Sequence, residues 1–178
     1  MKKFLTITLM LCAFSQATFA MQQQGSFGVL LGASLLDKDI GGRFGYGVEG
    51  SYNINEMFSA GVWITNSTKT VGTTISAKVD ARVTNMMATA AYRKYGLYIG
   101  PMLGFSTLNV DARLPGSTLT VSASETNFSY GIFAGYDFTT DLPNFSFGPE
   151  FAYVNTPLSS VNSNYSSMNI LFAGKYLF

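Results

Sequence analysis

The sequence predicts an all-β protein, an eight-stranded antiparallel up-and-down transmembrane β-barrel. Three observations predict this fold. Only 12% of the residues are charged and 15% are aromatic, whereas a typical soluble domain has about 25% charged residues. After the first twenty residues, no apolar run approaches the roughly 20 residues that a transmembrane helix needs. Apolar and small or polar residues alternate instead, and strands in lipid satisfy all their backbone hydrogen bonds only in a closed barrel.

Residues 1–20 have the features of a signal peptide that is removed from the mature protein. Lys2 and Lys3 give a basic start, residues 4–14 form an apolar stretch too short for a membrane anchor, and residues 17–20 are mostly small. We expect the mature barrel domain to comprise residues 21–178. Cleavage after Ala17 fits nearly as well as cleavage after Ala20.

Eight segments with the two-residue period of a strand follow the leader. In each segment one face is bulky and apolar, and the other is built from Gly, Ser, Ala and Asn with a few charges. We expect strands over residues 26–36, 43–54, 57–67, 78–94, 97–107, 125–138, 144–154 and 167–178.

The alternation is clearest in the second, sixth, seventh and eighth segments. In residues 43–54 the bulky face consists of Phe44, Tyr46, Val48, Tyr52 and Ile54. In residues 125–138 it consists of Phe128, Tyr130, Ile132, Ala134, Tyr136 and Phe138. The last two segments contribute Phe145, Phe147, Pro149, Phe151 and Tyr153, and then Met168, Ile170, Phe172, Tyr176 and Phe178.

Short and long connections alternate along the chain. We expect short turns at residues 55–56, 95–96 and 139–143, and longer loops at residues 37–42, 68–77, 108–124 and 155–166. Short periplasmic turns and longer outer loops are typical of outer-membrane barrels, and an even number of strands places both termini in the periplasm.

Two of the longer connections have features of their own. Residues 68–83 still alternate, so they form either a hairpin that projects beyond the membrane or a mobile Thr-rich loop. Residues 108–125 are rich in Ser and Thr, and Pro115 with Gly116 is the expected turn at the tip of that loop.

Alternation alone does not decide which face points outward, because a soluble barrel would place its bulky face inside. Three features favour lipid on the outside. Charge is scarce, the small-residue face suits a narrow interior, and aromatic residues recur near the strand ends, where lipid headgroups lie.

Several charged residues fall on the small-residue face and are expected inside the barrel: Arg43, Glu49, Arg93, Asp137, Glu150 and Lys175. Buried charges are costly unless they are paired. We expect a polar network in which Glu150 and Glu49 reach toward Lys175 and Arg43. Eight strands leave an interior that side chains fill, so the network either closes the lumen or forms a narrow gated ion path.

The chain ends in an unusually apolar stretch, "LFAGKYLF". The spacing of Ala173, Tyr176 and Phe178 resembles the C-terminal signal by which the outer-membrane insertion machinery recognises barrel proteins. Families with this signal favour glycine at the position of Ala173. The alternative is that these aromatic residues only form a girdle at the membrane surface.

The leader, the eight segments, "GIFAGYDF" at residues 131–138 and the terminal "GKYLF" together resemble the small eight-stranded outer-membrane proteins of Gram-negative bacteria. This is the OmpA/OmpX/Ail-like and opacity-protein-like group. The resemblance implies an integral outer-membrane barrel surrounded by lipids and lipopolysaccharide. It also implies insertion by the barrel-assembly machinery, and surface loops that contact host or phage factors.

The chain contains no histidine, which removes the dyads and triads of serine hydrolases. The only cysteine, Cys12, lies in the leader. We therefore expect no catalysis, no cofactor and no metal site. Loop charges of both signs balance, and no basic stripe suggests nucleic-acid binding. The predicted function is cell-surface interaction, of the adhesion or resistance type, with envelope integrity. The alternatives are a narrow channel and, third, a soluble secreted ligand-binding barrel.

Overall fold

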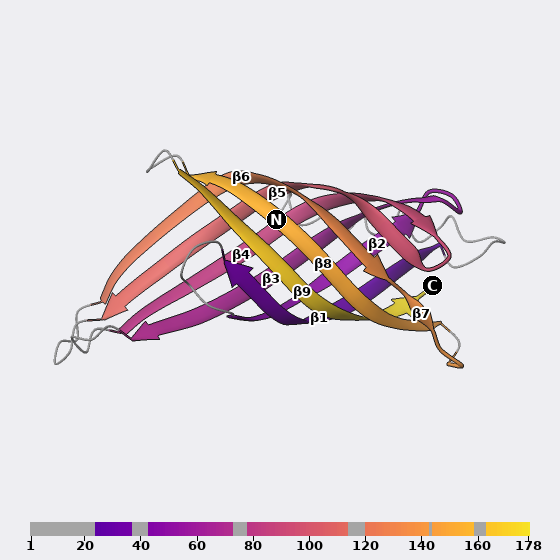
Figure 1. Cartoon of the computed structure of the whole chain (residues 1–178), viewed down its shortest axis with the longest axis horizontal. Helices are drawn as coiled ribbons and strands as arrows, with labels where there is room; N and C mark the ends of the chain where they lie inside the picture. Colours follow the sequence, from indigo (N-terminus) through magenta and orange to yellow (C-terminus); the bar gives the residue numbers. More distant parts are fainter. Residues whose placement is uncertain (1–23, 37–42, 73–77, 114–119, 143, 159–162) are drawn as a thin grey trace, which may run out of the picture.

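The computed structural model describes residues 24–36, 43–72, 78–113, 120–142, 144–158 and 163–178. These residues form strands and no helix (Figure 1). The strands are β1 (Gly25–Leu36), β2 (Arg43–Asn53), β3 (Phe58–Gly72), β4 (Lys78–Lys94), β5 (Leu97–Arg113), β6 (Thr120–Tyr136), β7 (Phe138–Thr139), β8 (Phe145–Leu158) and β9 (Ser163–Leu177).

The strands close into a barrel in which every neighbouring pair is antiparallel. β1 pairs with β2 on one side and with β9 on the other, and β6 pairs with β8. β7 continues β6 in the same register against β8, since Gly135 pairs with Glu150 and Phe138 with Phe147. In this register Pro149, which has no N–H to donate, lies opposite Tyr136, the last residue of β6. β6 and β7 thus form one barrel strand, and the predicted eight-stranded barrel is confirmed.

The short turns, the start of β1 and the end of β9 lie at one end of the barrel, here called the terminal end. Tyr95 and Gly96 have φ angles of 53° and 83°, the left-handed geometry that a two-residue hairpin needs. Asn55 Oδ1 accepts hydrogen bonds from the backbone of Met57 and Phe58 at 2.9 and 2.8 Å. The predicted turns at 55–56 and 95–96 are therefore confirmed.

At the opposite end, here called the hairpin end, the strands are longer than predicted. β3 and β4 stay paired up to Gly72 and Lys78, so the structure shows the hairpin, one of the two alternatives left open for residues 68–83, and the loop predicted at 68–77 is wrong in extent. The loops predicted at 108–124 and 155–166 are wrong in extent. Pairing between β5 and β6 continues to Arg113 and Thr120, and pairing between β8 and β9 continues to Leu158 and Ser163.

The physical reason for this difference is that Ser and Thr alternate as regularly as apolar residues do, and threonine favours strands. The predicted tip at residues 115–116 and the predicted loop at 37–42 lie outside the described residues. Figure 1 shows β3 to β6 reaching farthest from the barrel.

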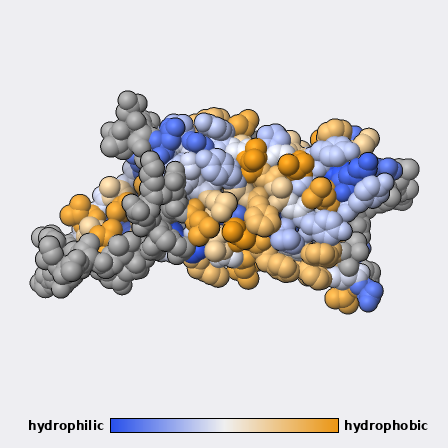
Figure 2. All heavy atoms as spheres, viewed as in Figure 1, coloured by the Kyte–Doolittle hydropathy of each residue, from blue (hydrophilic) through white to orange (hydrophobic). Residues whose placement is uncertain are grey.

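The bulky face of the alternation points outward, as predicted. Ile132, Phe44 and Phe128 are 60%, 64% and 54% exposed on the outside. Figure 2 shows apolar side chains over the middle of the visible barrel wall and hydrophilic ones toward its ends.

The outer face becomes polar at a row of threonines across β4, β5 and β6. Thr107 pairs with Thr84 and Thr126 in the strand register, and its hydroxyl lies 2.9 Å from that of Thr126. Asn66 of β3 extends the row by donating to the Thr84 hydroxyl at 2.9 Å. Residues 66–72, 78–84, 107–113 and 120–126, from this row outward, are called the projecting sheet below.

Candidate functional site

The barrel interior is divided into three layers along its length. Except for Arg43, the buried charged side chains lie toward the terminal end, together with Ser26, Ser59 and Ser146. The other buried hydroxyl and amide side chains lie toward the hairpin end. Between them lies an apolar layer of side chains that are at most 6% exposed: Leu30, Trp63, Met87, Met102, Phe133 and Leu171. The small-residue face therefore also carries large residues, which the alternation did not predict.

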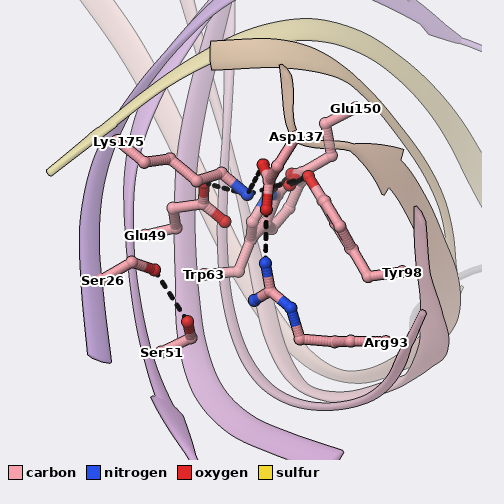
Figure 3. A network of polar contacts seen from close by, with 9 residues as sticks. All are labelled: Ser26, Glu49, Ser51, Trp63, Arg93, Tyr98, Asp137, Glu150 and Lys175. Atoms are coloured by element: carbon pink, nitrogen blue, oxygen red, sulfur yellow. Dashed lines mark hydrogen bonds and ion pairs between the residues drawn. The ribbon is translucent and has the colours of Figure 1, made fainter. Parts of the chain in front are cut away.

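Lys175 is the centre of the charged layer (Figure 3). Its Nζ lies 3.1 Å from Glu49 Oε1 and 3.1 Å from Asp137 Oδ1. It also donates a hydrogen bond to Tyr98 Oη at 2.9 Å and lies 4.2 Å from the centre of the Tyr98 ring. Lys175 is only 2% exposed, so these contacts replace the water that its charge would otherwise hold.

Arg93 forms the second cationic contact of the layer. Its Nη2 pairs with Asp137 Oδ2, and its guanidinium lies 5.2 Å from the centre of the Tyr98 ring. Asp137 thus bridges Lys175 and Arg93. The Arg93 side chain is 23% exposed, so water screens this pair more than it screens Lys175.

Glu150 is completely buried and accepts two hydrogen bonds. Trp63 Nε1 donates to its Oε1 at 2.6 Å, and Tyr98 Oη donates to its Oε2 at 2.8 Å. Tyr98 therefore connects Glu150 to Lys175. The sequence prediction missed Trp63 and Tyr98. The signal that could have found them is a polar-tipped aromatic residue on the small-residue face.

Arg43 does not join this network, contrary to the sequence prediction. It lies six residues before Glu49 on β2, a separation of about 20 Å at strand spacing. Its Nη1 donates to the Ala81 carbonyl at 3.4 Å. The structure therefore brings together Glu49, Arg93, Asp137, Glu150 and Lys175 and leaves Arg43 at the hairpin end.

A small cavity of about 20 Å³, enough space for about one water molecule, lies beside the network. Its lining includes Glu49, Ser51, Ser59, Thr89, Arg93 and Lys175. Among the described residues, no group of three or more acidic side chains is placed to hold a metal ion. The same residues contain no helix that is long and apolar enough to cross a membrane. The network can neutralise buried charge and fill the lumen.

The three residues of the predicted assembly signal lie on both faces of β9 and at its end. Tyr176 and Phe178 are 50% and 62% exposed on the outer wall, whereas Ala173 is fully buried inside. The backbone of Phe178 also exchanges two hydrogen bonds with Gly25, at 2.9 and 3.0 Å, and so joins residue 178 to the start of β1.

Comparison with solved structures supports the fold at low sequence identity. Ail of Yersinia pestis superposes with a TM-score of 0.66 at 17% identity, covering 89% of this chain and 100% of that one. Neisserial surface protein A gives 0.60 at 15% identity, covering 87% and 97%. The N-terminal β-barrel domain of Pseudomonas aeruginosa OprF gives 0.55 at 14% identity, covering 87% and 100%.

No curated protein matches the chain in sequence. Residues 6–178 match the family described as outer membrane protein beta-barrel domain. This match spans almost the whole chain, and its description agrees with the closed barrel and the apolar outer wall. The chain therefore belongs to the outer membrane protein beta-barrel domain family, and it is an outer-membrane β-barrel.

Proposed function

We propose that this protein is a non-catalytic outer-membrane barrel that presents its projecting sheet to partners outside the cell and contributes to envelope integrity. The observation that carries the proposal is the continuation of β3 to β6 beyond the threonine row as paired strands. The outer face of the projecting sheet continues the barrel face that carries Met86, Phe105 and Phe128. Its side chains are polar: Thr68, Asp80, Arg82, Asn109, Asp111, Arg113, Thr120, Ser122 and Ser124.

In the proposed orientation the hairpin end faces outward and both termini lie in the periplasm, after removal of residues 1–20. Outer-membrane lipids and lipopolysaccharide contact the apolar wall. Tyr176 and Phe178 serve first as a signal for the barrel-assembly machinery and then as membrane anchors. The short turns at the terminal end and the long strands at the other support this orientation.

The projecting sheet also offers a free edge. Residues 120–136 of β6 pair with β5, but only residues 130–135 pair with β8. Among the described residues, the stretch 120–124 pairs with a strand on one side only, so it can accept an extended segment of a partner. It carries no charge and no proline, so little blocks such pairing.

The charges of the projecting sheet favour a protein partner over a polyanion. Asp80 and Asp111 lie opposite each other, and Arg82 and Arg113 flank them on the same face. One structure of Ail, with a TM-score of 0.59 and 18% identity, is a complex with the heparin analogue sucrose octasulfate. For this chain, the balanced charges argue against a similar electrostatic capture.

A pair of truncations tests the proposal. In one variant a two-residue Asn-Gly turn replaces residues 109–124 and so connects Leu108 to Glu125. In the other variant the same turn replaces residues 69–81 and connects Thr68 to Arg82. Both joints connect residues that are already paired across the sheet, so the barrel wall stays intact. The control variant shortens the β8–β9 hairpin in the same way, from Asn155 to Ser166.

Bacteria or proteoliposomes carrying each variant are tested for binding to host cells and to a panel of host surface proteins. We expect both projecting-sheet variants to lose binding and the β8–β9 control to keep it. Equal binding by all folded variants, checked by heat-modifiable migration on gels, would contradict the proposal.

The apolar layer argues against the channel alternative. Trp63 and Met102 are each 1% exposed, and Leu30 is not exposed at all. A permeating ion would therefore have to give up its hydration water inside a packed apolar layer, which is costly for a charge. Planar-bilayer recording of the purified protein should show no stable conductance. Steady openings that disappear in a Glu150→Ala variant would support the channel instead.

A further inference from the structure

Within the part of the chain that the structure describes, Arg43 is a buried cation without a counter-ion at the hairpin end of the lumen. It is 4% exposed, and no carboxylate of the described residues forms an ion pair with it. Its Nη1 donates a hydrogen bond to the Ala81 carbonyl, and its Nε has no hydrogen-bond partner in the described ranges. This contrasts with Lys175 in the same lumen, which has two carboxylates and a hydroxyl within 3.1 Å.

A second unsatisfied donor lies at the same end of the lumen as Arg43. The Tyr165 hydroxyl is buried and has no hydrogen-bond partner among the described residues. Tyr165 lies opposite the buried Thr156 in the strand register, at the same end of the lumen as the buried Arg43. Ser34 lies opposite Arg43 on β2 and opposite Asn169 on β9 in the strand register. Ser34 and Asn169 are 1% and 2% exposed, so the neighbouring register positions on this inner face are polar and buried.

An arginine left alone in such a place is costly, because an unpaired buried charge loses its hydration without compensation. A water molecule could accept a hydrogen bond from Nε or Tyr165, but it would not neutralise the charge. A small anion would do both. The planar guanidinium fork matches the paired oxygens of a phosphate or sulfate group better than it matches a spherical ion such as chloride.

We propose that Arg43 and Tyr165 form a binding site for a single phosphate or sulfate group at the hairpin end of the lumen. Arg43 faces the lumen and not the lipid, so a lipid headgroup outside the wall does not reach it. The group is therefore either a free oxyanion or part of a small phosphorylated or sulfated saccharide that enters from the hairpin end.

Calorimetric titration of the folded protein in detergent micelles tests the site. Sodium sulfate and sodium phosphate are compared with sodium chloride at matched ionic strength, and glucose 6-sulfate is compared with glucose. The variants are Arg43→Gln, which removes the charge, and Tyr165→Phe, which removes only the hydroxyl. Arg82→Gln is the control, because Arg82 is an exposed arginine of the projecting sheet.

We expect saturable binding of sulfate or phosphate by the wild type and by Arg82→Gln. Affinity should fall at least tenfold in Arg43→Gln and severalfold in Tyr165→Phe. Tighter binding of glucose 6-sulfate than of sulfate would identify the saccharide source, and equal binding would identify the free ion.

Absence of saturable binding in the wild type, or equal binding by Arg43→Gln, would overturn the proposal. If Arg43→Gln does not fold, the Nε–Hε resonance of Arg43 in the ¹⁵N-labelled wild type decides. Saturating sulfate should shift that resonance, and an unchanged resonance would overturn the site.

Discussion

Replacing Lys175 with methionine removes the charge at the centre of the lumen network while nearly keeping the length of the side chain. Lys175 lies 3.1 Å from Glu49 and from Asp137 and donates to Tyr98 at 2.9 Å. Without it, two carboxylates lose a cation in a site that water scarcely reaches. Removing one partner of a buried ion pair costs about 3–5 kcal/mol, which lowers the folding equilibrium constant more than about a hundredfold.

The assay is urea unfolding of the protein in lipid vesicles, followed by the fluorescence of Trp63. Trp63 is the only tryptophan in the chain, and its Nε1 donates to Glu150 within the network. Lys94→Met is the control, because Lys94 is exposed at a turn of the terminal end and should change stability by less than about 0.5 kcal/mol.

The coupling free energy between Lys175 and Glu49 is measured by combining Lys175→Met with Glu49→Gln in a double variant. Residues in one network usually show a coupling free energy of about 0.5–3 kcal/mol, so the double variant should lose less stability than the two single variants together. A loss below about 1 kcal/mol for Lys175→Met, with additive effects in the double variant, would refute the account of the network.

Three further predictions concern the wall and its assembly. Gly148→Ala should destabilise the barrel by about 1–3 kcal/mol in the same urea assay, because a Cβ there would lie 1.6 Å from the Tyr136 carbonyl oxygen. Gly174→Ala, whose Cβ meets nothing within 4 Å, should stay within about 0.5 kcal/mol, and equal losses would contradict the packing argument. Phe178→Ser should lower the fraction of heat-modifiable barrel in cells more than it lowers refolding in detergent, and equal losses in both would favour the girdle alone. Ile132→Arg, on the outer wall, should cost about 2–4 kcal/mol in lipid vesicles, and a neutral effect would argue against lipid contact at that position.

The strands and their faces could be predicted from the sequence because the two-residue period reports them directly. Phe128, Tyr130 and Ile132 alternate with Asn127, Ser129 and Gly131 whatever the partner strands are. The ends of the strands at the hairpin end could not be predicted in the same way. Ser and Thr occur in both strands and loops, and only the register between β5 and β6 shows that residues 108–113 are paired.

The network was predicted only in part because it depends on contacts between distant segments. Trp63 and Glu150 are 87 residues apart in sequence, and Lys175 and Tyr98 are 77 apart. Charge on the inner face was enough to select Glu150 and Lys175, but not to find the aromatic donors that connect them. The sequence prediction included Arg43 in the same network because Arg43 lies on the inner face of its strand. Its position along the barrel axis, at the hairpin end, separates it from the other charged residues.

The central claim is that the bulky face contacts lipid and the other face lies in a closed lumen. Fluorescence quenching by lipids with brominated acyl chains measures this directly. In the wild type, Trp63 is 1% exposed and should be quenched weakly. In a Trp63→Phe, Ile132→Trp variant, the new tryptophan should be quenched strongly. Strong quenching of Trp63 with weak quenching at position 132 would contradict the account.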